Sequence, residues 1–142
     1  MKKKAVWLIT MFLLLYGCAT TAHFTSTPDN ATFEISGSYV RGTTPKTGSV
    51  SRTTFGKYKV KAEKEGCEPI YSILPLDVSI GTIAVDIALF APALFFNIQR
   101  AFQFYEFDFE KGTIKYRKAE SRPWHTYDPS DSLKAEVQEY FK

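Results

Sequence analysis

The sequence predicts an α+β protein made of a small β-module, a central apolar helical segment, a β-hairpin and a short C-terminal helix. Three patterns lead to this fold class. Residues 31–36 and 56–63 alternate apolar and polar side chains, as half-buried strands do. Residues 78–98 are almost wholly apolar and repeat their large side chains at helical spacing. Residues 105–118 alternate again on both sides of a Lys-Gly turn, which is typical of a β-hairpin.

The N-terminus has the pattern of an export signal. Three lysines at positions 2–4 precede an apolar run at residues 5–16. A basic start followed by a short apolar run is typical of a secretory signal peptide. The run has 12 residues, whereas a membrane-spanning helix needs about 20. We therefore expect residues 1–17 to be a signal peptide that the mature protein lacks.

The run ends in Leu15, Tyr16, Gly17 and Cys18, which resembles the lipobox of bacterial lipoproteins. In that family the cut site needs a thiol with a small residue before it, and Gly17 and Cys18 supply both. The resemblance implies that Cys18 is acylated, that the chain is cut before it, and that several acyl chains hold the protein on a membrane. Ala19, where an aspartate would signal inner-membrane retention, implies the outer membrane. The alternative is an ordinary signal peptide with a chance cysteine.

Charge and cysteine counts limit the partners and the means of stabilisation. The chain has 18 Lys and Arg against 15 Asp and Glu, and removing the signal peptide takes away three lysines and no acid. The mature chain is then neutral, which gives no reason to expect nucleic-acid binding. With Cys18 acylated, Cys67 is left alone, so no intrachain disulfide is available. We expect Cys67 to be a small buried hydrophobe rather than a reactive thiol.

A β-module is predicted at residues 23–72, after a small polar tether at residues 18–22. Its two clearest strands place Ala31, Phe33, Ile35, Tyr58, Val60 and Ala62 on buried faces. The opposite face of the second strand carries three lysines, for which a solvated surface is favoured over an anion-binding patch. Residues 37–48 are rich in Gly, Thr and Ser and are predicted to be a loop.

Short motifs mark this module. They are Ser26-Thr27-Pro28, Ala31-Thr32-Phe33-Glu34-Ile35, Gly42-Thr43-Thr44-Pro45, Gly56-Lys57-Tyr58-Lys59-Val60 and Gly66. Together they resemble the PEGA domain, although Cys67 takes the place of the family's usual aromatic residue and the usual Asp-Gly pair is absent near Gly37. The resemblance implies a small extracytoplasmic β-sandwich that serves as a surface or interaction module. It brings no catalytic residues, so it argues for a fold more than for a function.

Residues 78–98 form a 21-residue apolar stretch whose strongly polar members are Asp86 and Asn97. A buried helix, broken near Pro92, is favoured because the polar side chains follow one thin helical stripe. A membrane-inserted helix is the alternative, but Asp86 offsets about 3 kcal/mol of a gain of roughly 5 kcal/mol from the apolar side chains. A helical hairpin that dips into the leaflet beside the lipid fits the same pattern. Asp86 is expected to have a structural partner.

Residues 73–118 are expected to pack this helical segment and a β-hairpin onto the same domain. A two-residue turn at Lys111 and Gly112 sets the register of the hairpin, in which apolar and charged faces both match. It pairs Phe109 with Ile114, Phe107 with Tyr116, Asp108 with Lys115 and Glu106 with Arg117. Because bases oppose two of the three acids around Asp108, a structural role is favoured over a calcium or general-acid site.

Residues 119–142 form a polar tail that ends in a predicted helix at residues 132–141. Asp128 or Ser130 is expected to cap the start of this helix. Upstream of the cap, Trp124 either packs on the sheet or forms an exposed contact.

No constellation for catalysis or metal binding is found. The glycines do not fit a phosphate loop, no serine lies in a G-x-S-x-G motif, and His23 and His125 are far apart with no ligand-spaced partner. We therefore expect no enzyme activity, no cofactor and no metal. The leading function is a non-catalytic cell-envelope lipoprotein, a lipid-tethered binding or structural module on the periplasmic side. Its expected partners are the membrane and other envelope proteins. The alternative is an integral component of an envelope membrane complex that uses residues 78–98 as an inserted segment.

Overall fold

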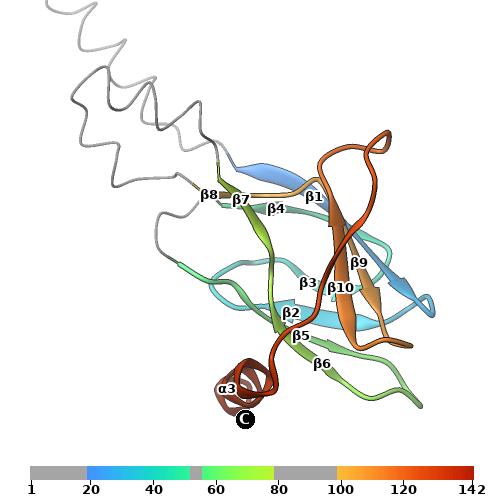
Figure 1. The fold of residues 1–142 in the computed structure, drawn as a ribbon, viewed down its shortest axis with the longest axis vertical. Coiled ribbons are helices and arrows are strands. Elements are labelled where there is room, and N and C mark those ends of the chain that lie inside the picture. The colour runs from blue at the N-terminus through green and yellow to red at the C-terminus, as the bar shows by residue number, and fades with distance from the viewer. Residues whose placement is uncertain (1–18, 52–55, 79–98) are drawn as a thin grey trace, which may run out of the picture.

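Two β-sheets packed face to face form the body of the protein in the computed structural model, which describes residues 19–51, 56–78 and 99–142 (Figure 1). The larger sheet has the strand order β11-β10-β9-β1-β4, with β1 and β9 parallel. Its strands are β1 (Thr20–Thr27), β4 (Lys46–Val50), β9 (Phe104–Asp108), β10 (Thr113–Arg117) and β11 (His125–Tyr127). The smaller, antiparallel sheet has the order β3-β2-β5-β6. Its strands are β2 (Thr32–Ile35), β3 (Arg41–Thr43), β5 (Lys59–Glu63) and β6 (Ile70–Ile73).

A short ribbon and one helix complete the described fold. The strands β7 (Leu76–Val78) and β8 (Gln99–Ala101) pair as a separate antiparallel ribbon, and α3 spans Asp131–Tyr140. The described residues are therefore β-rich, with one short C-terminal helix. The central apolar helical segment predicted at residues 78–98 is not supported. Val78 belongs to β7, and residues 79–98 lie outside the described residues.

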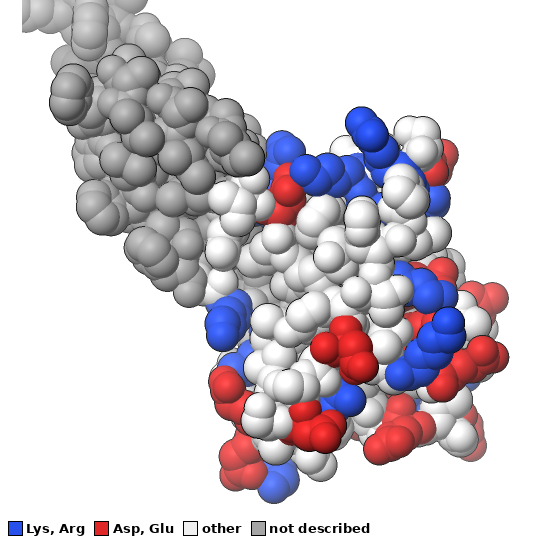
Figure 2. Space-filling view, viewed as in Figure 1, with Lys and Arg blue, Asp and Glu red and all other residues white. Residues whose placement is uncertain are grey.

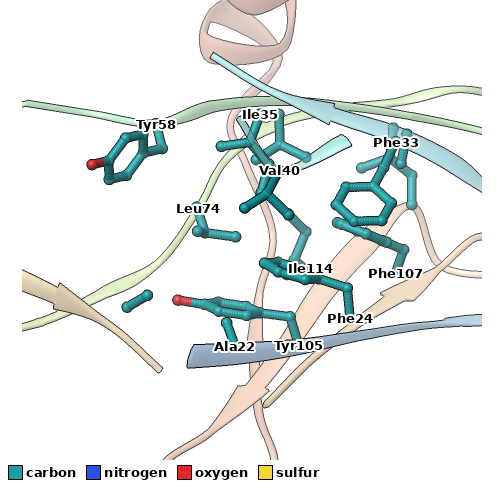
Figure 3. Packing of buried hydrophobic residues seen from close by; sticks show 14 of the residues in the cluster. Ala22, Phe24, Phe33, Ile35, Val40, Tyr58, Leu74, Tyr105, Phe107 and Ile114 are labelled. Carbon is teal, nitrogen blue, oxygen red and sulfur yellow. The ribbon is translucent and has the colours of Figure 1, made fainter. Parts of the chain in front are cut away.

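Alternating side chains from both sheets fill the core between them (Figure 3). The predicted inward side chains are confirmed, since Ala31, Phe33, Ile35, Tyr58, Val60 and Ala62 are all buried. The larger sheet contributes Phe24, Tyr105 and Phe107 from the other side. The ring centroids of Phe24 and Phe33 lie 4.9 Å apart and those of Phe33 and Phe107 lie 5.3 Å apart, so aromatic contacts join the two sheets. Burying each such ring stabilises the fold by roughly 1.5–3 kcal/mol.

The hairpin β9–β10 forms, but its predicted register is wrong by two residues. The observed pairs include Phe107 with Ile114, Glu106 with Lys115, Tyr105 with Tyr116 and Phe104 with Arg117. The loop is residues 109–112, because the Asp108 carboxylate accepts a hydrogen bond from the Lys111 N–H at 3.2 Å and Gly112 takes a φ of 67°. A shift of two residues keeps each side chain on its face, so the buried side of the hairpin was still predicted correctly.

Residues 37–48 were predicted to be a loop, yet they contain β3 and the start of β4. The strand β3 extends the smaller sheet beside β2, whereas β4 pairs with β1 in the larger sheet. The small residues that suggested a loop have a packing reason here. A Cβ on Gly48 would lie 2.5 Å from Cγ1 of Val40, so β4 passes too close to Val40 for any larger residue.

The predicted C-terminal helix is confirmed as α3. Ser130 is its N-cap, and the Ser130 side chain accepts a hydrogen bond from the backbone of the first turn. The helix lies against β5 and β6 on the side away from the core and buries Val137 (Figure 1). Lys59 pairs there with Glu136 at 3.2 Å and lies 4.7 Å from the centre of the Tyr140 ring. The lysine face of β5, expected to be solvated, is therefore partly covered.

Candidate functional site

The residues predicted to carry the anchor lie outside the described part of the chain. They are Leu15, Tyr16, Gly17 and Cys18, and Asp86 also falls outside it. The strand β1 begins at Thr20, so residues 20–22 of the predicted tether belong to a strand, and Ala22 is fully buried. Between Cys18 and the folded domain there is only Ala19.

The start of β1 lies at one end of the sandwich, which we call the N-terminal pole. Because β1 and β9 run parallel, the start of β9 and the end of its antiparallel partner β10 lie at the same end. The β7–β8 ribbon also reaches this end, since Thr20, Asp77 and Arg100 line one small cavity of about 120 Å³. The N-terminal pole thus consists of Thr20, the ribbon, residues 102–104 and residues 117–124, which run from the end of β10 to the start of β11 (Figure 1).

Asp77 joins the ribbon to the rest of the N-terminal pole. Its carboxylate pairs with Arg100 on β8 at 3.1 Å and with Lys118, just after β10, at 2.8 Å. The Asp77 side chain is 13% exposed, so two cations neutralise a carboxylate that is largely removed from water. One positive charge is left in excess within this group of three.

A buried hydroxyl attaches the segments on both sides of residues 79–98 to β9. The Tyr105 hydroxyl donates a hydrogen bond to the Pro75 carbonyl at 2.7 Å and accepts one from the Phe102 N–H at 2.8 Å. Burial raises the pKa of Tyr105, so the phenol stays a neutral donor at ordinary pH.

Ser26 and Thr44, both from the PEGA-like motifs, form a buried hydrogen-bonded pair. Their hydroxyl oxygens lie 2.5 Å apart, and Oγ1 of Thr44 accepts a hydrogen bond from the Ala31 N–H at 3.0 Å. The Ser26 hydroxyl donates to the Pro28 carbonyl at 2.7 Å. Ser26 is 4% exposed and Thr44 is 2% exposed, so these hydroxyls join strand ends and are not available to a substrate.

The acidic residues of β9 are held by Lys115. Its Nζ lies 2.8 Å from a carboxylate oxygen of Asp108 and 2.9 Å from one of Glu106. Burial acts to raise the pKa of Asp108, but hydrogen bonds from Lys115 and from the Lys111 N–H outweigh it and hold that pKa below its usual range. The carboxylates therefore have structural partners. Among the described residues, no three His, Cys, Asp or Glu side chains are grouped to hold a metal ion.

In the part of the chain that the structure describes, the remaining side chains of a type used in catalysis include two histidines and Cys67. His23 shares a hydrogen bond with Oγ1 of Thr47 at 2.9 Å, and His125 stacks on Tyr116. Within residues 19–51, 56–78 and 99–142, neither imidazole contacts a carboxylate that could orient it. Cys67, expected to be buried, is only half-buried against the edge of the core.

Sequence reasoning missed the basic residues of the N-terminal pole. Arg100, Lys118 and Arg122 line its cavities, but they come from the ribbon and from a loop. No local motif marks them, because strand pairing between distant segments brings them together.

No protein-family model, curated protein or solved structure matches the chain. The resemblances to bacterial lipoproteins and to the PEGA domain therefore stay predictions that rest on the residues quoted for them. In the part of the chain that the structure describes, no helix has the length and apolar composition of a membrane span.

Proposed function

We propose that the protein is a non-catalytic cell-envelope lipoprotein, a lipid-tethered binding or structural module on the periplasmic face of the outer membrane. The order of basic residues, apolar run and lipobox in residues 1–18 supports export and acylation of Cys18. The start of β1 at Thr20 supports direct attachment of a folded domain to that lipid.

The spacing between Cys18 and Thr20 is the observation that carries the proposal. Two residues span at most about 7 Å. One headgroup layer of a bilayer is roughly 5–8 Å thick. An acylated Cys18 would therefore hold the N-terminal pole at the membrane surface, with α3 toward the other end of the molecule (Figure 1).

A PEGA-like sandwich is part of the proposal. The face-to-face sheets and the buried pair of Ser26 and Thr44 support it, because the motif residues serve the fold. The larger sheet also needs β9, β10 and β11, which lie beyond residues 23–72. The module is therefore one body with the C-terminal half of the chain.

The β7–β8 ribbon favours a second candidate function. Residues 79–98 leave and rejoin the described fold at the N-terminal pole, where Asp77 and Thr20 line the same cavity. An apolar segment that starts there would meet the same bilayer as the lipid on Cys18. This placement suits an integral component of an envelope membrane complex that uses residues 78–98 as an inserted segment.

Alkaline carbonate washing of bacterial membranes tests both functions. A Cys18→Ala variant with an ordinary cleavable signal should be released, whereas the unaltered protein and a Cys67→Ala control should stay bound. Release of the unaltered protein would refute the lipid anchor. Retention of Cys18→Ala would instead establish attachment through residues 78–98.

A further inference from the structure

We propose that the N-terminal pole binds the anionic headgroups of membrane phospholipids through Arg100, Lys118 and Arg122, and that this binding orients the domain on the bilayer. The inference rests on the proposed lipid anchor, which brings the N-terminal pole to the surface. It adds a ligand class and a binding surface that the anchor alone does not require.

Positive charge is in excess at the N-terminal pole. Asp77 lies between Arg100 and Lys118, and Arg122 is exposed without an ion pair inside the described ranges. In Figure 2 this end shows mainly Lys and Arg side chains, whereas the other end shows acidic and basic side chains mixed together. An anionic surface therefore attracts the N-terminal pole more strongly than the other end, so electrostatics favours the same orientation as the short tether.

A shallow hollow at the N-terminal pole offers a place for a headgroup. Its volume is about 490 Å³, and its lining is Phe102, Tyr116, Lys118, Arg122, Pro123 and His125. Lys118 and Arg122 supply charged donors for a phosphate, and the aromatic rings supply apolar walls. Phe102 and Lys118 also line the small cavity beside Thr20, so the hollow lies next to the point where the lipid would attach.

Trp124 gives the N-terminal pole the composition of a membrane interface. Its side chain is 38% exposed, and the guanidinium of Arg117 lies 4.3 Å from the centre of its ring. Tryptophan and tyrosine beside arginine and lysine are typical of protein surfaces that lie at headgroup level. The exposed contact that the sequence left open for Trp124 is therefore assigned to the bilayer.

Trp124 is also a natural probe, because Trp7, the other tryptophan, falls in the predicted signal peptide. The lipidated full-length mature protein is reconstituted into vesicles of phosphatidylcholine, with or without phosphatidylglycerol. Quenching of Trp124 fluorescence by headgroup spin-labelled lipid reports contact of the N-terminal pole with the bilayer, and flotation with the vesicles reports the anchor. We expect stronger quenching with phosphatidylglycerol and a loss of this difference at high salt.

The variant Arg122→Gln should weaken the contact equilibrium about fivefold, as expected for one basic residue at an anionic surface. Lys111→Gln, in the loop at the opposite end of β9 and β10, is the matched control and should leave quenching unchanged. Equal quenching in both lipids, or an unaltered signal in Arg122→Gln, from protein that floats with the vesicles would overturn headgroup binding and leave the anchor intact. Protein that does not float would overturn the anchor, and headgroup binding with it.

Discussion

Replacing Tyr105 by phenylalanine removes one buried hydroxyl that holds the segments around the β7–β8 ribbon. That hydroxyl satisfies the Pro75 carbonyl and the Phe102 N–H. Phenylalanine keeps the ring stacked on Phe24, with the centroids 5.3 Å apart, so the core loses no apolar contact. Two backbone groups would lose their partner beside a residue that is fully buried. Because an unpaired buried polar group costs about 1–3 kcal/mol, we expect the free energy of unfolding to fall by about 2 kcal/mol.

Urea unfolding followed by Trp124 fluorescence measures this loss. In thermal unfolding, the same loss should lower the Tm by about 8 °C, because the unfolding entropy is about 2.1 cal/mol/K per residue. Tyr116→Phe is the matched control, because Tyr116 faces Tyr105 across the hairpin and its hydroxyl makes no hydrogen bond within the described residues. A loss below about 0.5 kcal/mol for Tyr105→Phe, or one equal to that of the control, would refute the assigned role of the hydroxyl.

Two further substitutions address the buried polar groups. Thr44→Val removes the nearer of two acceptors of the Ala31 N–H and the hydroxyl partner of Ser26, so the free energy of unfolding in urea should fall by about 1–3 kcal/mol. The exposed Thr43→Val should change it by less than about 0.5 kcal/mol, and equal effects would contradict the buried pair. In the folded protein, the pKa of Asp108 is held below its usual value of about 3.9. The ionised Asp108 carboxylate therefore stabilises the fold fully above about pH 3.9, and this stabilisation is lost as the pH falls through the folded pKa. Between neutral pH and about pH 3, the Tm of Asp108→Asn should therefore fall less than the Tm of the unaltered protein. Equal falls in Tm would show that the Asp108–Lys115 pair does not contribute to stability.

The alternation of apolar and polar residues predicted the buried side chains correctly, but it predicted the pairing of strands less well. Phe33 and Val60 were assigned to buried faces correctly, because every second side chain of a pleated strand points the same way. The hairpin register was missed because a Lys-Gly pair suggests a two-residue turn. The hydrogen bond from the Lys111 N–H to Asp108, which lengthens the loop, is visible only in three dimensions.

The N-terminal pole could not be predicted from sequence. It depends on the parallel pairing of β1 with β9, whose residues are distant in the chain and show no shared local pattern. The small and polar residues at the start of β1 suggested a tether. Ala22 is the first residue of this strand that is buried in the structure. The charge excess around Arg100 and Lys118 emerges only once these strands are paired.

The mass of the mature N-terminus tests acylation of Cys18 most directly. Tandem mass spectrometry of the N-terminal peptide, from protein extracted from bacterial membranes, should show a chain that begins at Cys18 and carries fatty acyl groups. An unmodified Cys18, or a chain that begins at any other residue, would contradict the lipid anchor and the membrane orientation inferred from it.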